Sequence, residues 1–196
     1  MQPFTTHTGT VVPLDRSNVD TDQLVPKQFL KRIERTGFGP ILFFAWRFDE
    51  AGNPLPSFPL NQPQYQGASI LIAGPNFGSG SSREHAVWAL QEYGFRVIIA
   101  PSFADIFASN AGKNGLLLIT LPAEQWQGLM TKAASPGYQL TADLINCCLT
   151  DSEGLSLPFQ VDESRRQKLL QGLDEIALTL RHVEKIQAFE ERMATR

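Results

Sequence analysis

Three serines, an arginine, a glutamate and a histidine crowd into the stretch GSGSSREHA, which runs from Gly78 to Ala86. Hydroxyl groups on a glycine-rich turn can exchange protons with a bound molecule, and a guanidinium holds a carboxylate through a planar fork. Arg83 would lie in the first turn of a following helix, where the dipole favours acids, so a cation there indicates an anionic ligand. The stretch therefore predicts a site for a carboxylate.

The same residues have the spacing of a helix start. Ser81 precedes Glu84 by three residues, as in a capping box, and Gly94 ends the pattern. Between them the apolar residues recur at helical spacing: Ala86, Val87, Ala89, Leu90 and Tyr93. We expect a helix with Ser81 as its N-cap, whose free amides would favour a carboxylate or an ionised serine. Without a ligand, the pattern predicts a capped helix and a surface arginine.

Other catalytic patterns do not fit this stretch. A dinucleotide fingerprint needs a glycine where Arg83 stands, and a phosphate-binding loop needs a Gly-Lys-Ser/Thr triplet. A nucleophile elbow needs a glycine two residues on either side of a serine, and none of the three serines has both.

The only two cysteines are adjacent, Cys147 and Cys148. On a strand, neighbouring side chains point to opposite faces, so the pair is poorly placed to hold one ion. We expect buried free thiols and no metal or iron–sulfur cluster held by this chain.

Alternating buried strands and helices must position the glycine-rich stretch. Strands are expected at 9–14, 68–74, 96–101 and 116–121, with helices from Ser81 to Gly94 and over 102–115. Strand–helix–strand units at this spacing predict right-handed crossovers and a parallel sheet segment. The glycine-rich stretch would then lie directly after a buried strand.

The remaining segments are less regular. The aromatic block 41–48 could be a buried helix or strand, and the proline-rich segment 53–63 must be a loop. Residues 137–159 read as short strands with a turn at 151–154, and the chain from Asp162 onward reads as helix, interrupted near Gly172. We expect one α/β domain over 1–161 and a helical C-terminal tail over 162–196.

Composition limits the function. The 196 residues are 42% hydrophobic, enough for one substantial core, and the net charge of −3 gives no cationic surface for nucleic acid. The N-terminus lacks a secretion signal and no apolar run is long enough to span a bilayer, so we expect a cytoplasmic protein without nucleic-acid or membrane partners.

Three motifs carry a resemblance to a known family: GSGSSREHA (78–86), NVDTDQLVP (18–26) and FADIFASNAGKNGLLLI (103–119). They resemble the swivelling domain of the aconitase superfamily. A chain of this length with all three in this order resembles, over essentially its whole length, the small subunits of 3-isopropylmalate dehydratase. The resemblance implies an aconitase-like swivelling β/β/α domain with a partly parallel central sheet and flanking helices.

The resemblance also implies a partner and a reaction. A large subunit would carry a [4Fe–4S] cluster, which this chain does not bind, and form a heterodimer or heterotetramer with it. The enzyme would isomerise 2-isopropylmalate and 3-isopropylmalate, which are small dicarboxylates, through 2-isopropylmaleate in leucine biosynthesis. Related small subunits act on citraconate and methylmalate or on homoaconitate, and these alternatives stay open. A dicarboxylate-binding module without catalysis is the alternative outside enzymes.

The matching positions imply roles in such an active site. Ser81 matches the catalytic serine, which takes and returns a carbon-bound proton, and Arg83 matches the arginine that supports it and pairs with a substrate carboxylate. Ser82 matches a hydroxyl that donates to substrate, and Asp22 matches an acid of the active-site network. His85 belongs to the motif, but we expect it to be structural.

The loop after Pro26 would determine substrate specificity. Its basic residues Lys27, Lys31, Arg32 and Arg35 are candidates for a second carboxylate clamp, of which Arg32 and Arg35 are favoured. Phe29 and Leu30 could contact an isopropyl group or anchor the loop to the core.

Overall fold

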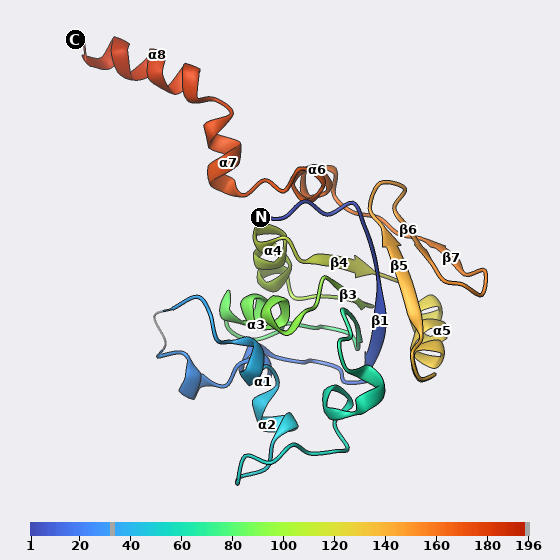
Figure 1. Cartoon of the computed structure of the whole chain (residues 1–196). Coiled ribbons are helices and arrows are strands. Elements are labelled where there is room, and N and C mark those ends of the chain that lie inside the picture. Colours follow the sequence, from blue (N-terminus) through green and yellow to red (C-terminus); the bar gives the residue numbers. More distant parts are fainter. Residues whose placement is uncertain (32–33, 195–196) are drawn as a thin grey trace.

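A seven-stranded mixed sheet forms the centre of the protein, as shown by a computed structural model that describes residues 1–31 and 34–194 (Figure 1). The strand order is β4-β3-β2-β1-β5-β6-β7. The strands are β1 Thr6–Leu14, β2 Ile70–Ala73, β3 Val97–Ala100, β4 Leu117–Thr120, β5 Gln139–Asp143, β6 Cys148–Thr150 and β7 Ser156–Pro158. Strands β1 to β4 are parallel, and β5 to β7 extend the sheet from β1 in antiparallel pairs.

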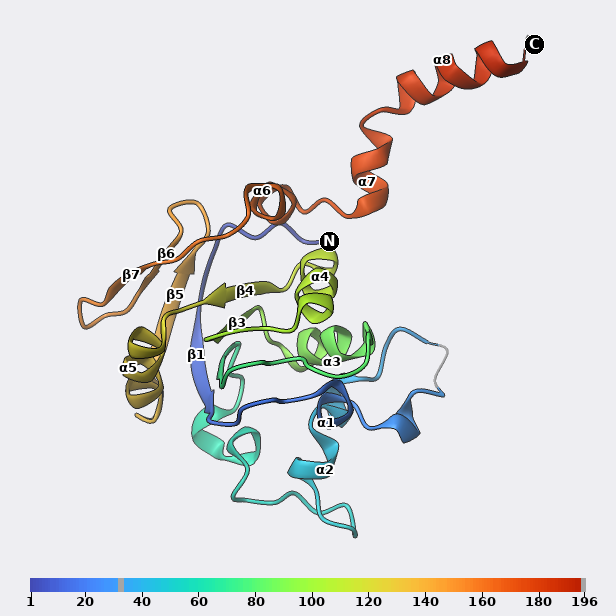
Figure 2. The ribbon, with the colours of Figure 1, turned by 180° about the vertical axis from the view of Figure 1, so that it is seen from behind.

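The helices are short and lie mostly on the two faces of the sheet (Figures 1 and 2). They are α1 Thr21–Leu24, α2 Phe44–Arg47, α3 His85–Tyr93, α4 Asp105–Asn114, α5 Ala123–Ala133, α6 Glu163–Gln171, α7 Glu175–Leu180 and α8 Val183–Ala194. Single 3-10 turns occur at Lys27–Phe29, Gly39–Ile41, Pro59–Asn61 and Pro63–Tyr65. Among the described residues, no helix is long and apolar enough to cross a membrane.

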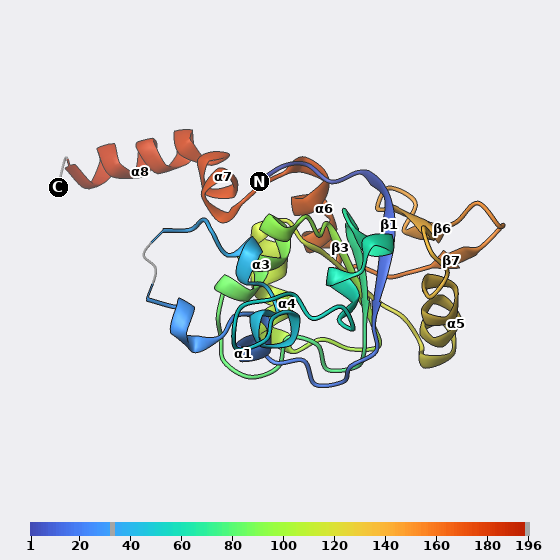
Figure 3. The same cartoon turned by 60° about the horizontal axis from the view of Figure 1, so that its bottom comes forward.

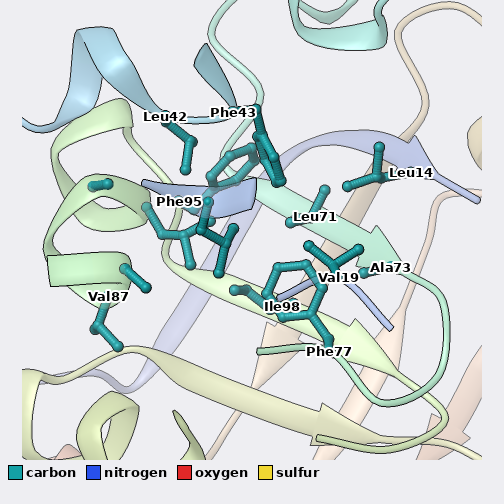
Figure 4. Close-up of a cluster of buried hydrophobic side chains, with 14 of the residues drawn as sticks. Leu14, Val19, Leu42, Phe43, Leu71, Ala73, Phe77, Val87, Phe95 and Ile98 are labelled. Atoms are coloured by element: carbon teal, nitrogen blue, oxygen red, sulfur yellow. The ribbon is translucent and has the colours of Figure 1, made fainter. Parts of the chain in front are cut away.

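Alternate residues of the parallel strands pack into two separate hydrophobic cores, because successive side chains of a strand point to opposite faces. Leu71 and Ile98 pack with α3, α4 and the aromatic residues of the segment before β2, including Phe43 (Figure 4). Ile72 and Ile99 face the other way and pack with α5 and α6. The four residues of β2 are all buried, as are those of β3. The parallel strands are therefore a rigid platform for the loops that follow them.

The strand predictions are confirmed, and so are the helix over 102–115, the loop at 53–63, the turn near 151–154 and the helical break at Gly172. Within the aromatic block only the single turn α2, Phe44–Arg47, is α-helical, and Phe48 after it forms a bridge with Pro54. Helix α5 is absent from the sequence-based prediction, although Trp126, Leu129 and Met130 recur at helical spacing and pack on the core. The division of the chain after residue 161 stays a prediction. In the segment after residue 161, α6 packs through Leu169 against the core that contains Ile72 and Ile99. Helices α7 and α8 extend away from the sheet (Figure 1).

The cysteine prediction is partly wrong. Both thiols are free, but they are half-buried, and Cys147 lies in the turn between β5 and β6 with a left-handed φ of 50° rather than on a strand. The apolar composition of this stretch favours a strand, but the chain forms a tight turn there. The Asp143 carboxylate stabilises the turn by accepting hydrogen bonds from the backbone and side chain of Asn146.

Candidate functional site

Three loops that follow the carboxyl ends of β1, β2 and β3 lie side by side. Asp20 pairs with Ser79, and Phe77 pairs with Phe103, each in a parallel bridge beyond the end of the regular sheet. The loops belong to the three motifs that are separated in sequence. Carboxyl ends of parallel strands are the usual place for ligands in α/β proteins, so this edge is the candidate site.

The loop after β1 is held against the loop after β2 by a continuous set of main-chain hydrogen bonds. The N–H of Gly78 donates to the carbonyl of Val19 at 2.7 Å, and the N–H of Thr21 donates to the carbonyl of Ser79 at 2.9 Å. The hydroxyl of Thr21, which is buried, donates to the carbonyl of Ser81 at 3.0 Å. Thr21 thus positions the backbone of Ser81, a role that sequence reasoning did not assign.

Gly78 allows the second loop to pass close to α4. Its φ is +80°, and a β-carbon there would meet the ring of Phe107 at 2.2 Å. A side chain at this position would be strained in both backbone conformation and space. The first glycine of the motif therefore serves close packing of the loop on α4.

The predicted capping box at Ser81 is wrong. Helix α3 begins at His85 with Glu84 in the N-cap position, so Ser81 and Arg83 both precede the helix. The N–H of Arg83 donates to the carbonyl of Ser81 at 2.8 Å, which closes a tight turn, and the Glu84 carboxylate accepts from Asn114 Nδ2 at 2.7 Å. The helix dipole therefore does not account for a cation at Arg83 or for ionisation of Ser81.

A real capping box lies in the neighbouring motif instead. The Asp20 carboxylate accepts from the N–H of Gln23 at 2.7 Å, and the Gln23 side chain accepts from the N–H of Asp20 at 2.9 Å. The spacing D-x-x-Q in DTDQ is the sequence signal that could have located it. This capping box fixes the single turn α1, which carries Asp22.

Arg83, Asp22 and Lys27 form a charged cluster next to Ser81. Arg83 Nη1 donates to Asp22 Oδ1, and Lys27 Nζ lies 3.5 Å from Asp22 Oδ2. The Arg83 side chain is largely buried, whereas Ser81 is exposed. Partial burial on its own raises the pKa of Asp22, but the hydrogen bond and charge of Arg83, together with Lys27, outweigh it and lower that pKa below its ordinary value.

With Asp22 ionised, Arg83 and Lys27 together give the cluster one net positive charge. An open hollow beside the cluster is lined by Asp20, Asp22, Gln23, Pro26, Lys27, Gln28 and Ala45. The guanidinium of Arg83 has five N–H donors and its contact with Asp22 uses Nη1, so further donors can hold a carboxylate. The cluster is thus suited to a small anionic ligand, and the exposed residues Ser81 and Ser82 directly precede Arg83 in the chain.

The structure brings together only part of the predicted clamp. Lys27 joins the cluster, Lys31 is exposed, and Arg35 lies over the ring of Trp88 at 5.2 Å, which is a contact with α3 and not with Asp22. Arg32, the other favoured residue, falls outside the described residues. Which of these residues binds substrate stays a prediction.

Phe29 and Leu30 pack against the core that contains Leu71 and Ile98. The ring of Phe29 meets that of Phe44 edge-on, with 5.0 Å between the ring centroids. This is the anchoring arrangement of the two alternatives, and it leaves their contact with substrate untested.

His85 lies among aromatic rings, 5.2 Å from Phe38 and 4.8 Å from Trp88 between centroids. Burial lowers the pKa of its imidazole, and the nearby Arg83 adds to this, while Glu84 opposes it. The ring packs at the first turn of α3.

The described residues offer no ligand set for an iron–sulfur cluster. Among the described residues, no three His, Cys, Asp or Glu side chains gather as metal ligands. The two cysteines lie near Asp143, which pairs with Thr6 at the start of β1, and so at the opposite end of β1 from the candidate site. The sulfur of Cys147 contacts the Leu144 carbonyl, and that of Cys148 contacts the Ser156 hydroxyl on β7.

Family models match nearly the whole chain. The aconitase C-terminal domain matches residues 1–124, a model described as LeuD_N matches 127–163, and the C-terminal domain of the 3-isopropylmalate dehydratase small subunit matches 175–196. The crystal structure of 3-isopropylmalate dehydratase from Methanocaldococcus jannaschii aligns with a TM-score of 0.67 at 23% identity, covering 94% of this chain and 99% of that one. That likeness confirms the predicted fold.

Curated relatives are much closer in sequence. The 3-isopropylmalate dehydratase small subunit of Rhodopirellula baltica is 60% identical over 97% of this chain and 98% of its own length. Those of Koribacter versatilis and Bacillus subtilis are 57% and 55% identical, over 99% and 100% of this chain and 100% and 98% of their own lengths. With three motifs meeting at one sheet edge, these matches show that the chain belongs to the family of 3-isopropylmalate dehydratase small subunits, within the aconitase superfamily.

Proposed function

We propose that the chain is the small subunit of a two-subunit hydro-lyase that isomerises 2-isopropylmalate and 3-isopropylmalate through 2-isopropylmaleate in leucine biosynthesis. The curated relatives are named 3-isopropylmalate dehydratase small subunit. They are 54–60% identical to this chain over nearly their full lengths, which supports the proposed activity. The observation that carries the site assignment is the Arg83–Asp22–Lys27 cluster, formed where the family motifs meet beside the exposed Ser81.

In this proposal the cations of the cluster bind the dicarboxylate. Arg83 is held in place by Asp22, so its remaining N–H donors are oriented before substrate arrives. Lys27 is mostly exposed and can turn from Asp22 towards a second carboxylate. The Ser82 hydroxyl donates to the same substrate.

Ser81 moves the proton. Dehydration removes a proton from a carbon next to a carboxylate, and hydration returns it to the neighbouring carbon, so one base serves both halves of the isomerisation. The negative charge that develops lies next to Arg83, which stabilises it electrostatically. Thr21 and the N–H of Arg83 hold the Ser81 carbonyl and thereby fix where the hydroxyl lies.

In this proposal the [4Fe–4S] cluster is bound by the large subunit, and the position of the two thiols of this chain, away from the site, supports that assignment. Bound there, it supplies the Lewis acid of the aconitase superfamily. The active site is then shared between the two subunits, and the large subunit is the obligatory partner.

Substitution of Ser81 by alanine tests the assignment in the reconstituted two-subunit enzyme. Turnover of 2-isopropylmalate should fall about 100- to 10,000-fold, the usual effect of losing a general acid–base group. Stability should not change, because Ser81 is exposed and the bonds that hold it use its carbonyl. Ser79→Ala in the same motif is the matched control and should retain turnover. A Ser81→Ala enzyme with near-normal turnover would refute the role of this serine.

A further inference from the structure

Helices α7 and α8 carry an apolar stripe on their exposed surface. Its six side chains are between 37% and 72% exposed. They are Ile176, Leu180, Val183, Ile186, Phe189 and Met193, and we call them the α7–α8 stripe. Elsewhere on the described residues, large hydrophobic side chains with comparable exposure are single, at Ile106 and Ile145. Contiguous exposed apolar patches are rare on proteins that act alone and mark interaction surfaces.

The two helices lack the packing that would stabilise them. Neither has a buried residue, and they have 6 and 12 residues, lengths at which a helix in water is marginal. The ion pair that joins α7 to α4, between Lys113 and Glu175 at 3.4 Å, lies at the very start of α7. An amphipathic helix is stabilised mainly by burial of its apolar face, so the stripe calls for a covering surface.

The family models indicate what covers it. Residues 1–124 match a domain that is the C-terminal part of aconitase, whereas 175–196 match a domain described for 3-isopropylmalate dehydratase small subunits. A domain within one chain stays close to its neighbours through the covalent linkage, at an effective concentration of the order of millimolar. A separate subunit must replace that linkage with non-covalent contacts. The stripe lies in the segment that the aconitase match does not include.

The position of the stripe suits a partner that also covers the candidate site. Ile176 lines the same surface hollow as Arg35 and Glu84, which lie next to the site loops. In Figures 1 and 3, α7 and α8 project from the side of the molecule that carries the loop after α1, opposite the β6–β7 hairpin. One partner surface can therefore reach the stripe and the site together.

We propose that the large subunit docks on the α7–α8 stripe, and that apolar contacts there hold the two subunits together. The identity of the partner rests on the proposed function. The role of the stripe is separate from catalysis, since the stripe contributes no residue to the site.

The test is a double variant on α8, Ile186→Gln/Phe189→Gln, in the full chain. Glutamine keeps helix propensity and removes apolar area. Calorimetric titration into the purified, cluster-loaded large subunit should show a Kd at least about tenfold higher than that of the wild type, given the usual effect of burying one such side chain. Turnover of 2-isopropylmalate at saturating small subunit should be unchanged. Ile145→Ser, an exposed apolar residue away from the stripe, should leave both Kd and turnover unchanged.

An unchanged Kd, with helix content intact by circular dichroism, would overturn the inference. Sedimentation of the small subunit alone tests whether the stripe instead binds a second copy of this chain. If the double variant abolishes self-association and leaves the affinity for the large subunit unchanged, the stripe binds a second copy and the inference is wrong. If the complex assembles through the stripe but wild-type enzyme does not turn over 2-isopropylmalate, docking stands and the proposed function fails.

Discussion

Two aspartates that pair with lysine or arginine, Asp22 and Asp151, differ in exposure. Asp22 pairs with Arg83 and Lys27 and its side chain is 39% exposed, at the edge of an open hollow. Asp151 pairs with Lys132 at 2.8 Å, and its side chain is 0% exposed.

The buried aspartate is saturated with hydrogen bonds. Tyr138 donates its hydroxyl to Asp151 at 2.8 Å, and the N–H groups of Glu153 and Leu155 donate at 2.8 and 2.9 Å. Burial alone would raise the pKa of Asp151, but Lys132, these amides and Tyr138 lower it well below its ordinary value. Burial, followed by the hydrogen bond to Asp151, raises the pKa of Tyr138.

The comparison teaches how to separate a structural ion pair from a functional one. Around Asp151 the donors converge on one carboxylate and enclose it, which stabilises the β6–β7 turn. Around Asp22, Lys27 is mostly exposed and Arg83 contacts the acid through Nη1, so both cations retain donors for a ligand. Substitutions in the two clusters should therefore separate loss of stability from loss of turnover.

Arg83→Lys should have the largest effect. Lysine keeps the charge but loses the planar fork that can hold Asp22 and a carboxylate together, so turnover should fall about 100- to 1,000-fold. The free energy of unfolding should change by less than about 1 kcal/mol, because Asp22 is exposed enough to be hydrated. Steady-state kinetics and urea unfolding measure the two quantities. Near-normal turnover would show that the cluster at Asp22 is structural as well.

Asp151→Ala should show the opposite pattern. It leaves the Tyr138 hydroxyl and two amides without their acceptor, and the free energy of unfolding should fall by about 2 to 3 kcal/mol. Turnover of the assembled enzyme should be normal at temperatures where it stays folded. Glu153→Ala, at an exposed partner of Lys132, is the control and should stay within about 0.5 kcal/mol of wild type. Loss of turnover in folded Asp151→Ala enzyme would contradict the distinction.

Thr21→Val should have an intermediate effect, mainly on catalysis. Valine fills the buried space but cannot donate to the Ser81 carbonyl, which should cost about 1 kcal/mol of stability and reduce kcat about tenfold or more through misplacement of Ser81. Thr21→Ser restores the donor and should recover kcat. If serine does not rescue kcat, the hydroxyl has no positioning role.

The smallest difference between the two clusters should be in how the free energy of unfolding depends on pH in acid. Both aspartates have a folded pKa below the ordinary 3.8, so the unfolded chain binds more protons as the pH falls through that value. The stability they contribute is therefore complete above about pH 4 and is lost as the pH falls towards their folded pKa. Asp151→Asn should flatten the dependence of unfolding free energy on pH below 4, and Asp22→Asn should change it less. Equal slopes would contradict the comparison.

Local patterns predicted the elements that are buried on both faces. The strands β2 to β4 are continuous apolar runs between glycines and helices, and the motif residues follow them directly. The contacts that make the site could not be read from spacing, because Arg83 and Asp22 are 61 residues apart and meet through the pairing of two loops.

The errors have a physical cause as well. Ser81 and Glu84 have the spacing of a capping box, but Thr21 holds the Ser81 carbonyl, Asn114 donates to the Glu84 carboxylate, and the helix starts at His85. The Asp151 cluster was missed entirely, since Lys132, Tyr138 and Asp151 belong to different segments and no local spacing rule connects them.

The main-chain bonds between the loops after β1 and β2 have a consequence for motion. Because Val19, Thr21, Gly78 and Ser79 are joined backbone to backbone, neither loop can open without breaking several bonds of the other. Ser81, Arg83 and Asp22 should therefore move as one body, and access to the site should come from displacement of the whole subunit relative to its partner. In relaxation-dispersion measurements, the amides of the two loops should share a single exchange rate.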